Sequence, residues 1–95
     1  MMIRIGLLGC GNIGHIIGQY RENIEIIALY DRVFQKAQDM ASTCGGIACK
    51  EFEQFVTGNF DYVVEAASVK AVRLFGEQVL QNGKHLIVLS VGAFS

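Results

Sequence analysis

Residues 3 to 14 read IRIGLLGCGNIG, and this stretch decides the fold. Its first half, Ile3 to Leu8, is a short aliphatic run typical of a strand that is buried on both faces. Three glycines follow at positions 9, 11 and 14, which is the spacing GxGxxG. From Asn12 the apolar residues recur at helical spacing. The stretch therefore predicts a strand, a tight glycine turn and a helix in direct succession.

A glycine turn between a buried strand and a helix is typical of a site for the diphosphate of a dinucleotide. Gly9 permits the tight turn, Gly11 lets the diphosphate approach the backbone, and Gly14 lets the helix pack against the strand. The free N–H groups at the helix N-terminus favour an anion there. A turn without a ligand is the alternative, but it does not need three glycines at these offsets. We therefore expect the whole turn to bind the coenzyme: Gly9, Cys10, Gly11, Asn12, Ile13 and Gly14.

The rest of the chain alternates between apolar runs and segments with helical periodicity. Strands are predicted at Ile24–Tyr30, Ile47–Cys49, Tyr62–Ala66 and His85–Val91, and helices at Val33–Cys44, Glu51–Val56 and Val69–Gln81. This alternation requires parallel strands joined by right-handed crossovers. We expect one α/β domain over residues 1–95, a doubly wound Rossmann-type sheet with strand order 3-2-1-4-5. Its ligand should lie beyond the carboxyl ends of the strands.

Asp31 and Arg32 follow the second predicted strand. An acidic residue about 20 residues beyond the glycine turn receives the adenosine ribose hydroxyls. Asp31 can instead cap the following helix, and both roles can coexist. Its carboxylate repels a 2′-phosphate, which favours NAD over NADP. Arg32 can pair with that phosphate or simply be solvated, so NADP stays open.

Small residues end the fourth and fifth predicted strands, where bulk would block the nicotinamide half of the coenzyme. Ala66, Ala67 and Ser68 follow the fourth strand, and Ser68 also suits the N-cap of the next helix. Ser90 and Gly92 close the fifth strand beside the expected nicotinamide ring, with an ordinary strand end as the alternative. All five are candidate coenzyme contacts.

Neither a metal site nor a catalytic residue is expected in this chain. Cys10, Cys44 and Cys49 are odd in number and lack a CxxC spacing, which indicates reduced thiols. Cys10 has no base beside it in sequence, so packing is favoured over a role as nucleophile. His15 is expected at the surface, and His85 at the edge of the sheet opposite the site.

Charge and hydropathy exclude several partners. A net charge of −1 and a pI of about 6.0 give no positive field to attract nucleic acid or anionic lipid. No apolar stretch approaches the roughly 18 to 20 residues that cross a bilayer, and no signal peptide opens the chain, so we expect a cytoplasmic protein. A mean hydropathy of +0.36 with 18% charged residues indicates that another domain or subunit covers part of the surface.

Several runs resemble the amino-terminal part of L-aspartate dehydrogenase: GLLGCGNIG at 6–14, YDR at 30–32, VVEAAS at 63–68 with AV at 71–72, and HLIVLSVGAFS at 85–95. The glycine run is shared by many Rossmann enzymes, whereas VVEAAS followed by LIVLSVGAF is more particular. The resemblance implies oxidation of L-aspartate by NAD or NADP to iminoaspartate. This product hydrolyses to oxaloacetate and ammonia or feeds pyridine-nucleotide synthesis.

The resemblance also implies a homodimer whose carboxy-terminal domain supplies the subunit interface, the substrate-binding groups and an acid/base histidine. We expect that domain to be absent here, so that neither His15 nor His85 is catalytic and the chain alone is inactive. A non-catalytic nucleotide-sensing module is the alternative, because a small Rossmann unit suffices for it. An uncovered fifth strand favours the dehydrogenase. Homoserine dehydrogenase and dihydrodipicolinate reductase share the coenzyme half and stay open as alternatives.

Overall fold

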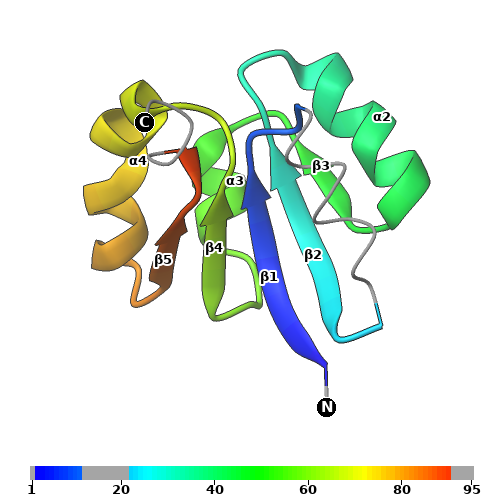
Figure 1. The fold of residues 1–95 in the computed structure, drawn as a ribbon, viewed down its shortest axis with the longest axis horizontal. Coiled ribbons are helices and arrows are strands. Elements are labelled where there is room, and N and C mark those ends of the chain that lie inside the picture. The colour runs from blue at the N-terminus through cyan, green and yellow to red at the C-terminus, as the bar shows by residue number, and fades with distance from the viewer. Residues whose placement is uncertain (1, 12–21, 91–95) are drawn as a thin grey trace.

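The computed structural model describes residues 2–11 and 22–90. Five strands lie in these ranges: β1 (Ile3–Leu8), β2 (Ile24–Tyr30), β3 (Ile47–Cys49), β4 (Tyr62–Glu65) and β5 (His85–Val88). The helices are α2 (Phe34–Cys44), α3 (Phe52–Val56) and α4 (Val69–Gln81). The strands form one parallel sheet in the order β3-β2-β1-β4-β5, which confirms the predicted topology (Figure 1). The helix predicted from Asn12 lies outside the described residues.

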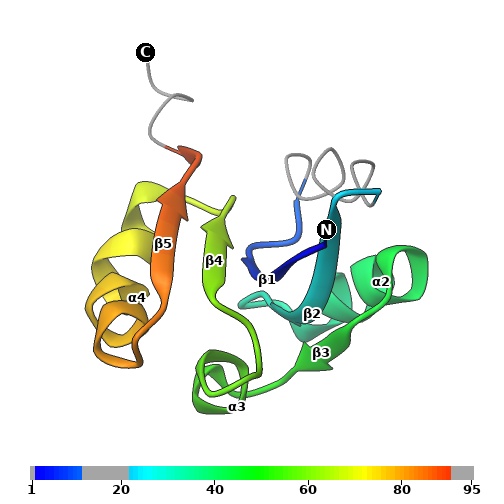
Figure 2. The same ribbon diagram turned by 90° about the horizontal axis from the view of Figure 1, so that it is seen from below.

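Described helices pack on both faces of this sheet (Figure 2). On one face, Met40 of α2 packs in a core with Leu7 of β1. On the other face, Phe55 of α3 and Val79 of α4 form a second core with Leu8. Adjacent strand residues point to opposite faces, so Leu7 and Leu8 belong to different cores. Burial on both faces explains why the strands read as continuous aliphatic runs.

Strand β5 is shorter than predicted: it ends at Val88, whereas the prediction extended it to Val91. The Leu89 N–H still donates to the carbonyl of Glu65 at 3.0 Å. At Ser90 the hydroxyl turns inward and donates to the Glu65 carboxylate at 2.6 Å. The strand therefore gives way to a side-chain contact that links the ends of β4 and β5. Strand β4 likewise ends one residue before the predicted Ala66, at Glu65.

Candidate nucleotide-binding site

The carboxyl ends of β1, β2 and β4 lie at one edge of the sheet, uppermost in Figure 1. Backbone hydrogen bonds join the segments that follow these strands. The Gly9 N–H donates to the Tyr30 carbonyl at 2.8 Å, and the Ala66 N–H donates to the Leu8 carbonyl at 2.8 Å. The glycine turn, the end of β2 and the small residues after β4 are therefore adjacent, as the topology predicted.

The first two glycines of the turn have different surroundings. Gly9 has a φ of 97°, which L side chains rarely adopt, and a Cβ there would lie 2.6 Å from the Cβ of Ala67. The fold itself therefore requires Gly9. At Gly11, by contrast, no atom of residues 2–11 or 22–90 lies within 4 Å of the position that a Cβ would occupy. This open backbone suits the approach of a diphosphate. The rest of the predicted turn lies outside the described residues: Asn12, Ile13 and Gly14.

Asp31 connects the glycine turn to the start of α2. Its Oδ2 accepts a hydrogen bond from the Cys10 N–H at 2.9 Å, and its Oδ1 accepts one from the Val33 N–H at 2.8 Å. The N-cap of α2 is Val33, so Asp31 supports the helix from two residues upstream of the cap. A carboxylate oxygen can accept two hydrogen bonds, which leaves capacity for ribose hydroxyls. The carboxylate is thus fixed at the position where a ribose is expected.

A hollow extends from the glycine turn to the first turns of α4. Gly9, Asp31 and Arg32 line one side of it, and Lys70 and Leu74 of α4 line another. The Leu74 side chain is 59% exposed and gives this wall an apolar surface. Concave sites with apolar walls and a few fixed polar groups are typical of cofactor binding. The hollow is therefore the candidate position for the adenosine half of a dinucleotide.

Glu65 is a buried carboxylate that the sequence analysis did not single out. Its side chain has 0% exposure, and its Oε2 accepts hydrogen bonds from the N–H groups of Ala67 and Ser68, both at 2.7 Å. Its Oε1 accepts the Ser90 hydroxyl at 2.6 Å. Glu65 therefore holds the segments after β4 and β5 together. The only signal in the sequence is one acidic residue within the apolar run YVVEAA.

The predicted nicotinamide-side residues have distinct environments. Ser68 is the N-cap of α4, and its Oγ accepts the Ala71 N–H at 3.1 Å, which confirms the predicted cap. Ser90 is 3% exposed, with its hydroxyl bonded to Glu65. Ala66 is buried and Ala67 is exposed. Gly92 lies outside the described residues. Coenzyme contacts at these positions stay a prediction.

Cys10 is a buried residue of the glycine turn, and its thiol is expected to react slowly. Burial, followed by the negative charges of Asp31 and Cys44, raises the pKa of the Cys10 thiol from 9.0 to about 12. The reactive thiolate is correspondingly rare near neutral pH. In the native chain, iodoacetamide should modify the half-buried Cys44 at least about tenfold faster than Cys10. Mass spectrometry of the alkylated peptides measures both rates. If Cys10 and Cys44 are modified at equal rates in the native chain, and again after unfolding in urea, then Cys10 is not protected by burial.

His85 lies at the amino end of β5, away from the site, as predicted. Its ring is exposed and packs against Tyr62, with 5.2 Å between the ring centroids. His15 lies outside the described residues.

Across residues 2–11 and 22–90, no group of three or more His, Cys, Asp or Glu residues could hold a metal ion. No helix in the same ranges is long and apolar enough to cross a membrane.

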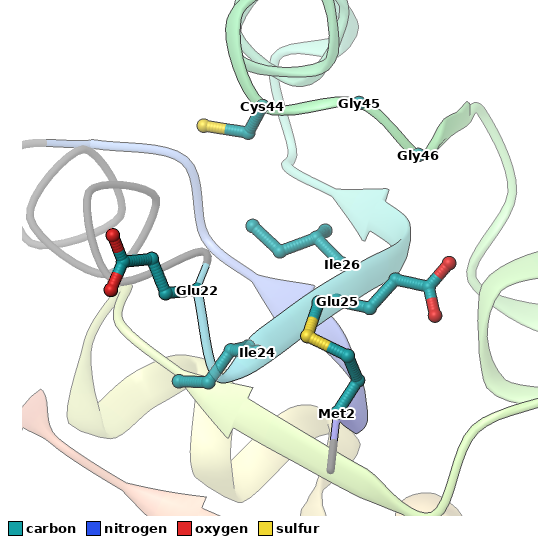
Figure 3. Close-up of a pocket in the computed structure, with 8 residues that line it drawn as sticks. All are labelled: Met2, Glu22, Ile24, Glu25, Ile26, Cys44, Gly45 and Gly46. Atoms are coloured by element: carbon teal, nitrogen blue, oxygen red, sulfur yellow. The ribbon is translucent and has the colours of Figure 1, made fainter.

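A second hollow lies between the start of β2 and the end of α2 (Figure 3). Glu22 and Glu25 line it, but their carboxylates point away from each other (Figure 3). It is formed at the amino end of β2, whereas ligands of parallel α/β sheets bind beyond the carboxyl ends. The described residues that line this hollow therefore do not form the convergent polar groups of a coenzyme site.

A doubly wound sheet, an open glycine turn and a fixed carboxylate after β2 together define a nucleotide-binding Rossmann domain. The family model described as "Homoserine dehydrogenase, NAD binding domain" matches residues 5–95, and the chain belongs to this family. The L-aspartate dehydrogenase of Methanospirillum hungatei is 49% identical over 99% of this chain. That of Methanocaldococcus jannaschii is 39% identical, also over 99% of the chain.

These relatives confirm the resemblance to the NAD-binding domain of L-aspartate dehydrogenases. The chain spans only 37% of the length of each relative. Among solved structures, GenD2 from gentamicin A biosynthesis, in complex with NAD, superposes with a TM-score of 0.82. It is 16% identical, and the match covers 92% of this chain and 26% of GenD2, which supports the fold.

Proposed function

We propose that the chain binds NAD or NADP along the carboxyl edge of its sheet. The observation that carries this proposal is the open backbone at Gly11 beside the fixed carboxylate of Asp31. In this arrangement the turn holds the diphosphate and Asp31, with Arg32 beside it, holds the adenosine ribose. The nicotinamide half then lies near Ala67, Ser68 and Ser90, which Glu65 links by hydrogen bonds.

We further propose that the protein containing this domain oxidises L-aspartate, which the 49% identical relative supports. When bound, the nicotinamide ring supplies the hydride acceptor. L-Aspartate gives up the hydride from Cα and a proton from its amino group, forming iminoaspartate, which water converts to oxaloacetate and ammonia. The residues of this chain bind and orient the coenzyme. In this proposal, a further domain binds the substrate and transfers the proton. The whole protein is proposed to be a cytoplasmic homodimer.

The 95-residue chain alone is expected to bind NAD without oxidising L-aspartate. Calorimetric titration measures binding, and the absorbance of NADH measures oxidation. A fusion of this chain to the carboxy-terminal part of the Methanospirillum hungatei relative should produce NADH when aspartate is added. Sustained NADH production by the chain alone would contradict the division of roles. A folded fusion that binds NAD but ignores aspartate would favour the nucleotide-sensing alternative.

A further inference from the structure

The hollow beside the glycine turn contains more positive than negative side chains. Asp31 and Arg32 line it from the end of β2, and Lys70 lines it from α4. The Asp31 carboxylate already accepts two backbone N–H groups. Within residues 2–11 and 22–90, no hydrogen bond or ion pair engages the side chain of Arg32 or Lys70. Two cations from different segments, neither paired with another described residue, therefore line the hollow together with a partly satisfied carboxylate.

Lys70 occupies a position that the fold itself does not favour. It is the second residue of α4, and the first turn of this helix contains no acidic residue. The N-terminus of a helix carries a partial positive charge, so a cation there is unfavourable. Residues that break a local rule without compensation among the described residues are expected mainly at functional or strained sites. The charge of Lys70 is therefore better explained by an anion that enters the hollow.

We infer that Lys70, together with Arg32, receives the 2′-phosphate of NADP, so that the hollow accepts NADP as well as NAD. This inference rests on the proposed coenzyme site. A phosphate monoester carries a charge of about −1.5 to −2 at neutral pH, and Asp31 repels it. The positive charge of Arg32 only offsets the negative charge of Asp31. Adding Lys70 gives the side chains that line the hollow a net positive charge. Lys70 is thus a specificity-determining residue, which the helical pattern alone places on an ordinary polar face.

The inference is tested by titrating NADP and NAD calorimetrically into the wild-type chain and the variant Lys70→Ala. The variant should bind NADP about five- to tenfold more weakly and NAD within about twofold of the wild type. Arg73→Ala is the matched control, because Arg73 is exposed on the same helix but does not line the hollow. This control removes the same net charge and should change neither affinity.

Three outcomes overturn the inference in distinguishable ways. Unchanged NADP affinity in Lys70→Ala means that Lys70 does not contact the phosphate. An equal loss of NAD and NADP affinity means that Lys70 contacts a part common to both coenzymes. If the folded wild type binds neither coenzyme, the proposed function fails and the inference fails with it. Thermal unfolding checks that each variant is folded.

Discussion

Glu65→Ala is expected to lower the free energy of unfolding by about 2 to 4 kcal/mol, a large part of the stability of a small domain. The Glu65 carboxylate accepts hydrogen bonds from Ala67, Ser68 and Ser90, at 2.7, 2.7 and 2.6 Å. Removing it leaves three donors without their acceptor, of which only the Ser90 hydroxyl is fully buried. A buried donor left unpaired costs about 1 to 3 kcal/mol, whereas water can reach the two part-buried N–H groups and reduce their cost. Urea denaturation followed by circular dichroism measures the loss.

Two variants separate this network from general effects of substitution. Glu65→Gln keeps an acceptor oxygen for the N–H groups of Ala67 and Ser68, so it should recover much of the lost stability. Glu77→Ala removes an exposed glutamate from α4 and should change stability by less than about 0.5 kcal/mol. If Glu65→Ala unfolds at the same urea concentration as the wild type, the network does not stabilise the fold.

The sequence predicted the order and type of the described elements, although β3 and α3 are too short for their periodicity alone to separate strand from helix. Long aliphatic runs indicated β1 and β2, and a regular apolar face with a serine cap indicated α4. The end of β5 was not predicted: the apolar run continues past Val88, where the Ser90 hydroxyl already contacts Glu65. These residues are 25 positions apart, and their contact exists only once β4 and β5 are paired. Boundaries set by tertiary contacts leave no local pattern.

The candidate site was predictable where spacing determines position. Gly9 and Asp31 each follow a strand, so parallel topology alone brings them to one edge. Glu65 was missed because a single acidic residue in an apolar run does not reveal its hydrogen-bond partners. Lys70 was not singled out from the sequence, and its place in the hollow depends on how α4 packs beside the end of β2. These contacts are visible only in three dimensions.

Gly11→Ala is expected to leave the fold intact and to weaken NAD binding at least about tenfold, or 1.4 kcal/mol. Among the described residues, no atom lies within 4 Å of the added Cβ, so we expect them to accommodate it. The same Cβ projects into the space assigned to the diphosphate. Gly9→Ala provides the contrast, since its Cβ would meet Ala67 at 2.6 Å and its φ of 97° disfavours a side chain. That variant should lose stability as well as binding.

Calorimetric titration of NAD into the wild type and into Gly11→Ala, with unfolding curves for both, tests the diphosphate cradle most directly. The account predicts saturable heat with the wild type, a marked loss of affinity in the variant and closely similar unfolding curves. Equal affinity in the two proteins, or the absence of heat with a folded wild type, would show that the glycine turn does not bind the coenzyme.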